Sequence, residues 1–138
     1  MKFAYDIFAA ERAIAVRYAG KFTLAELLAT AAQLLDDPRY SPEYDGLVDL
    51  TDLSVAAGIA DFRALIEFVR GHGRVSRGRW AAVAATPVAT ACGLVYKQAM
   101  APRQTFEVFS TPEAACAFLG LRSEPAPDGG AGVALRRH

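Results

Sequence analysis

The stretch Gly46-Leu47-Val48-Asp49-Leu50-Thr51 decides the fold. It is a short apolar run that holds one carboxylate, and it follows a polar segment that is rich in Asp, Tyr and Pro. An apolar run of this length is typical of a strand buried on both faces, which predicts an α/β sheet with helices on both sides. We expect residues 52–60 to form a loop at the carboxyl end of this strand, where open α/β sheets place ligand or partner sites.

The region before the central strand predicts a hairpin. Apolar residues alternate with polar or small ones in two segments, at Phe3, Tyr5 and Ile7 and again at Ile14, Val16 and Tyr18. A period of two is typical of half-buried strands. Because only residues 9–12 connect the two segments, we expect the strands to pair antiparallel, the second one ending at Gly20.

The rest of the chain alternates helices and strands. Thr23 and Glu26 form a capping box that opens a helix, which ends before Pro38. The helix after the central strand is expected to take Asp61 as its N-cap. Further elements are a strand over residues 80–85, a helix from Thr86-Pro87, a strand over 105–109 and a last helix over 110–120.

Residues 121–138 differ in composition from the preceding chain. They include Pro125, Pro127 and several glycines, with few bulky side chains to bury. We therefore predict one α/β domain over residues 1–120, followed by a disordered tail over 121–138. The predicted order is β-β-α-β-α-β-α-β-α. It indicates a mixed sheet, with an antiparallel hairpin first and parallel strands joined by right-handed crossovers after it.

Composition excludes some classes of function. Of the 138 residues, 53% are hydrophobic, which suits one globular domain. Fifteen basic and fifteen acidic side chains cancel, so we expect no nucleic-acid partner. The chain has neither a signal-peptide pattern nor an apolar run long enough for a membrane span, which favours the cytoplasm. Cys92 and Cys116 lie in apolar helical patterns and are expected to be buried, reduced thiols.

The carboxyl end of the central strand holds the candidate binding residues. They are Asp49, Thr51, Asp52 and Ser54, with Gly58, Asp61 and Arg63 from the following helix start. These groups could line a cleft, or they could serve ordinary loop and capping roles. Asp49 could act as a general base. No histidine or second carboxylate is adjacent to it in sequence, so we predict no catalytic residue.

Residues 70–79 hold four arginines, a histidine and three glycines. Arg74, Arg77 and Arg79 could bind an anion, but a solvated loop between a helix and a strand has the same composition. His72 has no partner spaced for nucleophilic or zinc chemistry, so we expect neither a metal nor a cofactor. Four aromatic residues could line an apolar pocket or serve as core residues: Tyr40, Tyr44, Tyr96 and Trp80.

The order of elements, with four short motifs, resembles the STAS or anti-sigma-factor-antagonist superfamily, and within it the SpoIIAA-like group of small bacterial proteins. The motifs are Gly20 before Thr23-Leu24, Asp37-Pro38-Arg39-Tyr40, Leu47-Val48-Asp49-Leu50, and Val108-Phe109 with Pro112-Glu113-Ala114-Ala115. The resemblance covers residues 1 to about 121. Phosphorylatable members carry Asp-Ser-Ser-Gly at the helix start, where this chain has Ala57-Gly58-Ile59-Ala60. The resemblance therefore implies a member without the usual acceptor serine.

Two functions follow as expectations. The first is a non-enzymatic regulatory module that binds a protein partner, or its own copy, through the region after the central strand. The second is a carrier of a small apolar or lipid-like ligand between sheet and helices. The alanine-rich segment 80–85 and the alanine-rich helix after it have little side-chain bulk, which could admit such a ligand but also permits close packing of helix on sheet.

Overall fold

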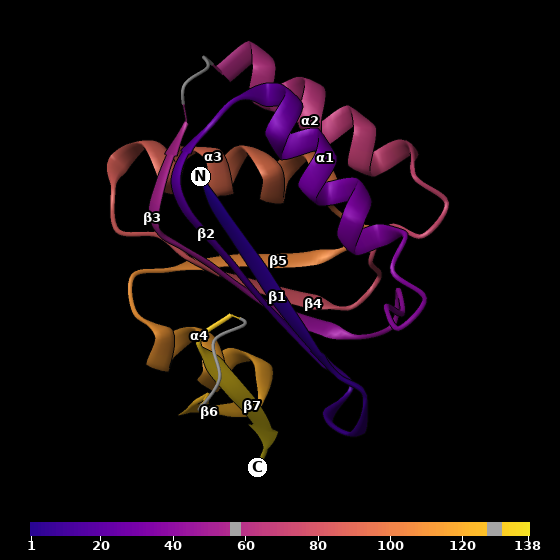
Figure 1. Cartoon of the computed structure of the whole chain (residues 1–138), viewed down its shortest axis with the longest axis vertical. Coiled ribbons are helices and arrows are strands. Elements are labelled where there is room, and N and C mark those ends of the chain that lie inside the picture. Colours follow the sequence, from indigo (N-terminus) through magenta and orange to yellow (C-terminus); the bar gives the residue numbers. More distant parts are fainter. Residues whose placement is uncertain (56–58, 127–130) are drawn as a thin grey trace.

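The computed structural model describes residues 1–55, 59–126 and 131–138 (Figure 1). Its centre is a five-stranded sheet in the order β1-β2-β3-β4-β5. The strands are β1 (Lys2–Phe8), β2 (Ala13–Phe22), β3 (Asp45–Val55), β4 (Arg79–Val83) and β5 (Thr105–Phe109). β1 pairs antiparallel with β2, and the later pairs are parallel. The predicted mixed α/β sheet, with β3 at its centre, is confirmed.

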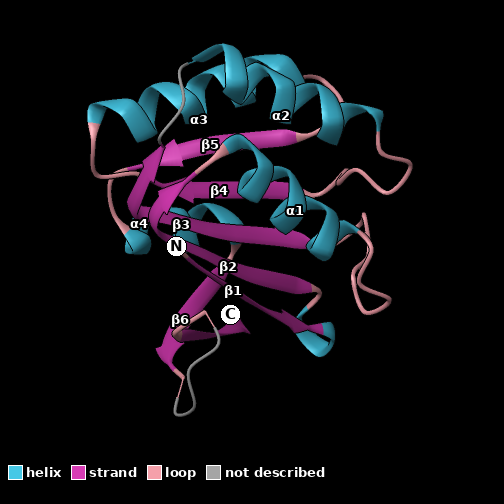
Figure 2. Cartoon of the chain, turned by 45° about the horizontal axis from the view of Figure 1, so that its top comes forward, coloured by secondary structure: helices cyan, strands magenta, loops and turns pink. Residues whose placement is uncertain are grey.

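Helices cover both faces of this sheet (Figure 2). α1 (Leu24–Leu35), α2 (Ile59–Gly71) and α3 (Pro87–Met100) lie on one face, and α4 (Pro112–Leu119) lies on the other. The predicted capping box of α1 forms, since the Glu26 amide donates to Thr23 Oγ1 and the Thr23 amide donates to Glu26 Oε1. Threonine N-caps followed by proline open α3 and α4, where proline's missing N–H costs no helical hydrogen bond. None of the described helices could cross a membrane.

The strands around the predicted site are longer than the sequence pattern indicated. β2 continues past Gly20 to Phe22, and β3 continues past Thr51 to Val55. The two extensions pair with each other, with Ala19 opposite Asp52 and Phe22 opposite Val55. Backbone pairing between distant segments thus outweighs the polar composition of β3. Most of the predicted loop over 52–60 is strand or helix, and Asp61 lies in the first turn of α2 rather than at its N-cap.

The predicted disordered tail is wrong for the described residues after 120. They form the hairpin β6 (Leu121–Pro125) and β7 (Val133–Arg137), with antiparallel pairing. The few apolar residues of this segment are nearly all used, because Leu121 and Leu135 are fully buried beneath α4. The Arg137 guanidinium fixes the hairpin by donating to the carbonyls of Glu11 and Leu119. Composition alone did not reveal these long-range contacts.

The sheet separates two apolar cores. The first lies under α4 and the hairpin and contains small residues such as Ala13, Ala15 and Ala81. The second lies under α1, α2 and α3 and contains large residues such as Trp80 and Phe106. Neighbouring residues of one strand point to opposite faces, so β4 sends Ala81 to the first core and Ala82 to the second.

Candidate ligand-binding cavity

A cavity of about 160 Å³ lies in the second core, between the sheet and the helices α1, α2 and α3. Alternate residues of β2 and β3, including Val16, Tyr18, Val48 and Leu50, form its floor because a period of two places them on one face. The helices supply the residues that recur at helical spacing on their inner faces. The lining from α1, α2 and α3 is Leu27, Ala31, Leu34, Leu35, Phe62, Leu65, Val69, Cys92, Gly93 and Tyr96.

Among the residues that the structure describes, two buried polar atoms of this lining have no hydrogen-bond partner. They are the Tyr40 hydroxyl and Gln104 Oε1, and the residues are only 4% and 5% exposed. Tyr40 lies in the segment before β3, and Gln104 directly precedes β5. Both therefore belong to the amino ends of parallel strands, while Leu53 and Phe62 line the cavity near the carboxyl end of β3. A buried polar group without a partner costs free energy, so these two atoms stand out in an otherwise apolar lining.

Tyr40 is held in place by its neighbours. The Arg74 guanidinium lies 5.2 Å from the centre of the Tyr40 ring and donates to the carbonyl oxygens of Leu35, Asp37 and Tyr40 itself. Burial raises the pKa of Tyr40 to about 12, although the Arg74 cation and the Ser76 hydroxyl oppose the shift. Ser76 thus lies near enough to affect this pKa but does not meet hydrogen-bond geometry. The Tyr40 hydroxyl stays protonated and can both donate and accept.

Ser76 instead fixes the indole of Trp80. Ser76 Oγ accepts from Trp80 Nε1 at 2.7 Å and from the Gly78 amide at 3.1 Å. The indole packs closely over the backbone at the start of β3. A Cβ atom at Gly46 would lie only 2.4 Å from its ring atoms. Glycine at position 46 therefore permits this ring to reach the cavity wall. A rigid wall of this kind is expected to keep the space open instead of collapsing into it.

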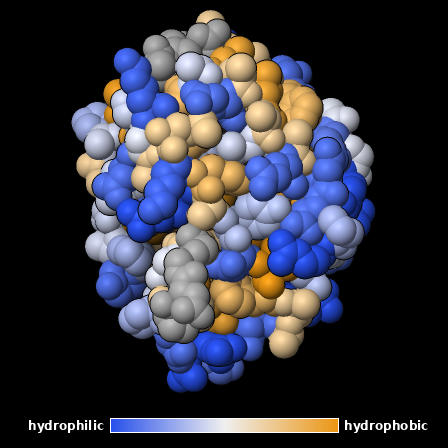
Figure 3. Space-filling view, in the orientation of Figure 1, coloured by the Kyte–Doolittle hydropathy of each residue, from blue (hydrophilic) through white to orange (hydrophobic). Residues whose placement is uncertain are grey.

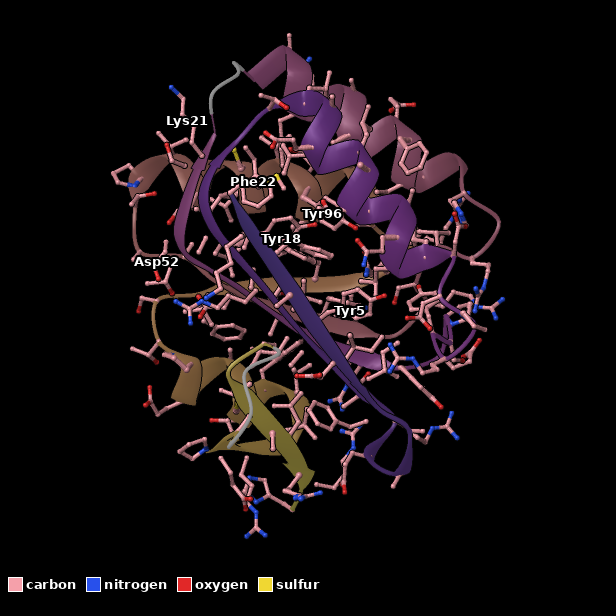
Figure 4. All side chains as sticks on the ribbon, in the orientation of Figure 1. Tyr5, Tyr18, Lys21, Phe22, Asp52 and Tyr96 are labelled. Carbon is pink, nitrogen blue, oxygen red and sulfur yellow. The ribbon has the colours of Figure 1, made fainter. Side chains whose placement is uncertain are left out.

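Tyr18 and Tyr96, which are labelled in Figure 4, also line the cavity. The Tyr18 and Thr30 oxygens are 3.1 Å apart, and Thr30 uses its own proton to bond the Leu27 carbonyl. Tyr18 is therefore the donor of this pair. Burial raises the pKa of both Tyr18 and Tyr96, and the neighbouring Tyr40 and Tyr18 raise that of Tyr96 further. No residue of the described lining carries a charge.

Five of the residues predicted at the carboxyl end of β3 are described and do not line this cavity: Asp49, Thr51, Asp52, Ser54 and Arg63. Asp49 Oδ1 accepts the Thr51 amide at 2.9 Å, and Asp52 pairs with Arg17 at 2.9 Å. Figure 4 shows Asp52 at the edge of the molecule, away from Tyr18 and Tyr96. Ser54 and Arg63 are exposed. Gly58 is outside the described residues, and Asp61 is described only as part of α2. Partner binding by this group stays a prediction.

The three arginines predicted to bind an anion contact other parts of the chain. Arg74 bonds carbonyl oxygens near the end of α1, Arg77 pairs with Glu43, and Arg79 bonds Asp45 and the last carbonyls of α4. His72 bonds Asp36 through Nε2 and accepts the Arg74 amide through Nδ1. These contacts stabilise loops and leave the predicted anion site without support from the geometry. Among the described residues, no group of three or more His, Cys, Asp or Glu is placed to hold a metal.

Sequence reasoning found only part of this cavity. Tyr40, Tyr96 and Trp80 were candidates for an apolar pocket and do line it, whereas Tyr44 does not. The alanines of β4 do not line it either, and the small residues that do are Ala31 of α1 with Cys92 and Gly93 of α3. Gln104 was missed. The one available signal was the position of Gln104 directly before an apolar strand, because a residue at such a position is expected to be buried.

Comparison with solved structures identifies the fold. The chain is similar to an uncharacterized protein of the DUF3478 family from Shewanella loihica PV-4, whose crystal structure has a SpoIIAA-like fold. The TM-score is 0.58 at 19% sequence identity, and the match covers 86% of this chain and 92% of that one. The chain has a SpoIIAA-like fold. The predicted resemblance is confirmed at the level of the fold. No family model and no curated protein matches the sequence.

Proposed function

We propose that this SpoIIAA-like protein is a non-enzymatic module that binds a small, uncharged and largely apolar molecule between its sheet and α1, α2 and α3. The observation that carries the proposal is the pair of buried, unpartnered polar atoms on Tyr40 and Gln104 in an apolar cavity. Ligand sites typically combine an apolar lining with a few polar groups that orient the ligand. A bound molecule would satisfy atoms that the chain itself leaves without partners.

Native mass spectrometry of the purified protein tests this proposal. The expected spectrum shows a species with extra mass that disappears on denaturation, either directly or after incubation with small aromatic compounds. Ala31→Leu fills part of the cavity from α1 and is expected to abolish the added mass. Ala29→Leu is the matched control, because Ala29 is exposed on the same helix. Equal binding by both variants, or none by the unmodified chain, would count against the cavity as a binding site.

A second candidate, the protein-interaction module, is favoured by the outer face of α3. Val88 and Leu94 are 62% and 51% exposed there, although large apolar side chains are usually buried. The exposed residues of this face are uncharged: Pro87, Val88, Ala91, Leu94 and Gln98. A symmetric dimer places the same patch on both subunits, so two copies could meet here without repulsion between like charges.

The oligomeric state tests this second candidate. Self-association through α3 predicts a dimer at micromolar concentration that Leu94→Glu dissociates and Gln98→Arg weakens less. A monomer at all concentrations would contradict it.

Figure 3 shows polar and apolar residues mixed over the face drawn there, with apolar residues gathered mainly in its upper part. The apolar, uncharged cavity remains the stronger basis for function, because it contains buried polar atoms without hydrogen-bond partners.

A further inference from the structure

The chemistry of the cavity narrows the class of its ligand. We infer that the ligand is an uncharged molecule of about one aromatic ring that carries a hydroxyl or N–H donor, and that this donor faces Gln104 at the amino end of β5. Phenols are the simplest compounds of this class. The inference rests on the proposed function and adds to it the size, charge and orientation of the ligand.

Size comes from the cavity volume. The 160 Å³ space is close to that of an engineered protein cavity of about 150 Å³ that holds benzene. A single ring with one or two small substituents fits such a space. A long acyl chain exceeds this volume. We therefore infer a smaller ligand than the lipid-like one expected from the sequence.

The charge of the ligand is inferred from the residues that line the cavity. Among the described residues of the lining there is no Asp, Glu, Lys, Arg or His, and transfer of an ionised group into an apolar site without a counter-ion is costly. The Arg74 guanidinium lies over the Tyr40 ring and donates to three backbone carbonyls. It is thus engaged by the chain and cannot serve as the counter-ion of a carboxylate. A neutral ligand follows.

The hydrogen-bonding groups of the ligand are inferred from the two unpartnered atoms of the cavity. Gln104 Oε1 only accepts hydrogen bonds, so its partner must donate. The Tyr40 hydroxyl can donate or accept, so it tolerates either kind of group. Two further polar groups of the wall are engaged within the chain, because Trp80 donates to Ser76 and Tyr18 donates to Thr30. The donor of the ligand is therefore directed to Gln104 and its apolar body toward Leu53 and Phe62.

A matched pair of ligands tests the inference. p-Cresol and p-xylene have the same shape, and one hydroxyl in the first replaces a methyl group in the second. The affinities of both compounds are measured by calorimetry on the whole chain and on three variants. Gln104→Leu removes the acceptor, and Tyr40→Phe removes the second polar atom without changing the ring. Gln98→Leu is the control, because Gln98 is exposed on α3 and does not line the cavity.

The readout is the ratio of the two affinities in each protein. Removal of one partner of a buried hydrogen bond should lower the preference for p-cresol by about tenfold in Gln104→Leu. Tyr40→Phe should lower it by a smaller factor and is expected to fold normally, since its hydroxyl has no partner to lose. Gln98→Leu should keep the ratio of the unmodified protein.

Each other result overturns the inference in a distinguishable way. If both compounds bind and Gln104→Leu leaves the ratio unchanged, the assigned donor orientation is wrong while the cavity remains a binding site. If hexadecanoic acid binds and p-cresol does not, the ligand class is wrong but the proposed binding function stands. If none of these compounds binds, the proposed function fails together with the inference.

Discussion

The two faces of the sheet are built from different side chains and differ in what they enclose. Under α4 and the β6–β7 hairpin, small residues such as Ala15, Ala81 and Ala115 let the covering elements approach the strands closely. Under α1, α2 and α3, large rings such as Trp80 and Tyr96 surround a cavity. The comparison teaches that the space in this fold lies on the face with bulky side chains, and not on the face that holds most of the strand alanines.

The buried polar groups of the two faces also differ in whether they have hydrogen-bond partners. On the α4 face, Asp45 accepts bonds from the Arg79 amide and from the guanidinium groups of Arg79 and Arg137. On the cavity face, Tyr40 and Gln104 each bury an atom with no partner. We interpret the first arrangement as structural and the second as functional, because an unpaired buried polar group lowers stability unless a ligand completes it.

The largest expected effect on stability comes from truncating a side chain under α4, on the face without the cavity, which we call the closed face. Leu119 is fully buried in the core under α4, so Leu119→Ala should lower the free energy of unfolding by about 2–5 kcal/mol. Leu53→Ala, at the wall of the cavity, should cost less than half as much because Leu53 is only half-buried. Chemical denaturation measures both. Equal losses would remove the contrast between a packed face and a hollow one.

Replacing a small side chain by a larger one should destabilise the face under α4 but not the cavity face. Ala115 is fully buried on the closed face, so Ala115→Leu should overpack it and lower the free energy of unfolding by about 1–3 kcal/mol. Ala31→Leu places the same side chain into the cavity and should be neutral or stabilising. Thermal unfolding of the two variants compares them directly. A large loss in Ala31→Leu would mean that the cavity wall cannot admit added atoms.

The charged contacts of the closed face should depend on pH. Burial raises the pKa of Asp45, but the hydrogen bonds from Arg79 and Arg137 outweigh it and hold the pKa below its usual value. The contribution of Asp45 is therefore complete above its unfolded pKa of about 4 and is lost as the pH falls through the lower folded pKa. Asp45→Asn should cost about 1.5 kcal/mol of unfolding free energy at pH 7 and progressively less in acid.

Asp52→Asn is the control for this prediction. Asp52 pairs with Arg17 through an ion pair whose side chains are 43% and 56% exposed, and exposed pairs contribute roughly 0–1 kcal/mol. Urea unfolding at pH 7 and at pH 3 measures both variants. The Asp45 account is contradicted if its variant behaves like Asp52→Asn, or if the difference from the unmodified protein grows as the pH falls.

The smallest expected effect concerns single hydroxyl groups on the cavity face. Tyr40→Phe removes an unpartnered hydroxyl and should leave the free energy of unfolding unchanged or raise it slightly. Tyr18→Phe removes the donor to Thr30 and should lower it by about 1 kcal/mol. Differential scanning calorimetry without ligand measures the pair. Destabilisation by Tyr40→Phe would show that its hydroxyl already has a partner.

Much of the fold was predictable because its signals are local. The capping box at Thr23, the threonine–proline helix starts and the alternation in β1 and β2 each depend on a few adjacent residues. The length of β3 was not predictable from such signals, because its last residues are strand only through their pairing with β2. The C-terminal hairpin depends in the same way on distant partners, such as Glu11 and Asp45 for Arg137.

The candidate site was predictable only in part. Aromatic side chains before and within apolar segments identified Tyr40, Trp80 and Tyr96 as possible pocket residues. The polar residues predicted as a site lie at the carboxyl end of β3, whereas the unpartnered atoms of the cavity belong to the amino ends of the strands. A cavity depends on how side-chain volumes from several distant elements add up, and a single sequence gives no direct measure of that sum.

The central claim is that one face of the sheet encloses a ligand-accessible apolar cavity while the other is closed. A crystal structure under xenon pressure tests it most directly, because xenon enters empty apolar cavities in proteins. The account predicts xenon between the sheet and α1, α2 and α3, near Tyr96 and Leu50, and none between the sheet and α4. An absence of xenon from the core under α1, α2 and α3, or its presence in the core under α4, would contradict the account.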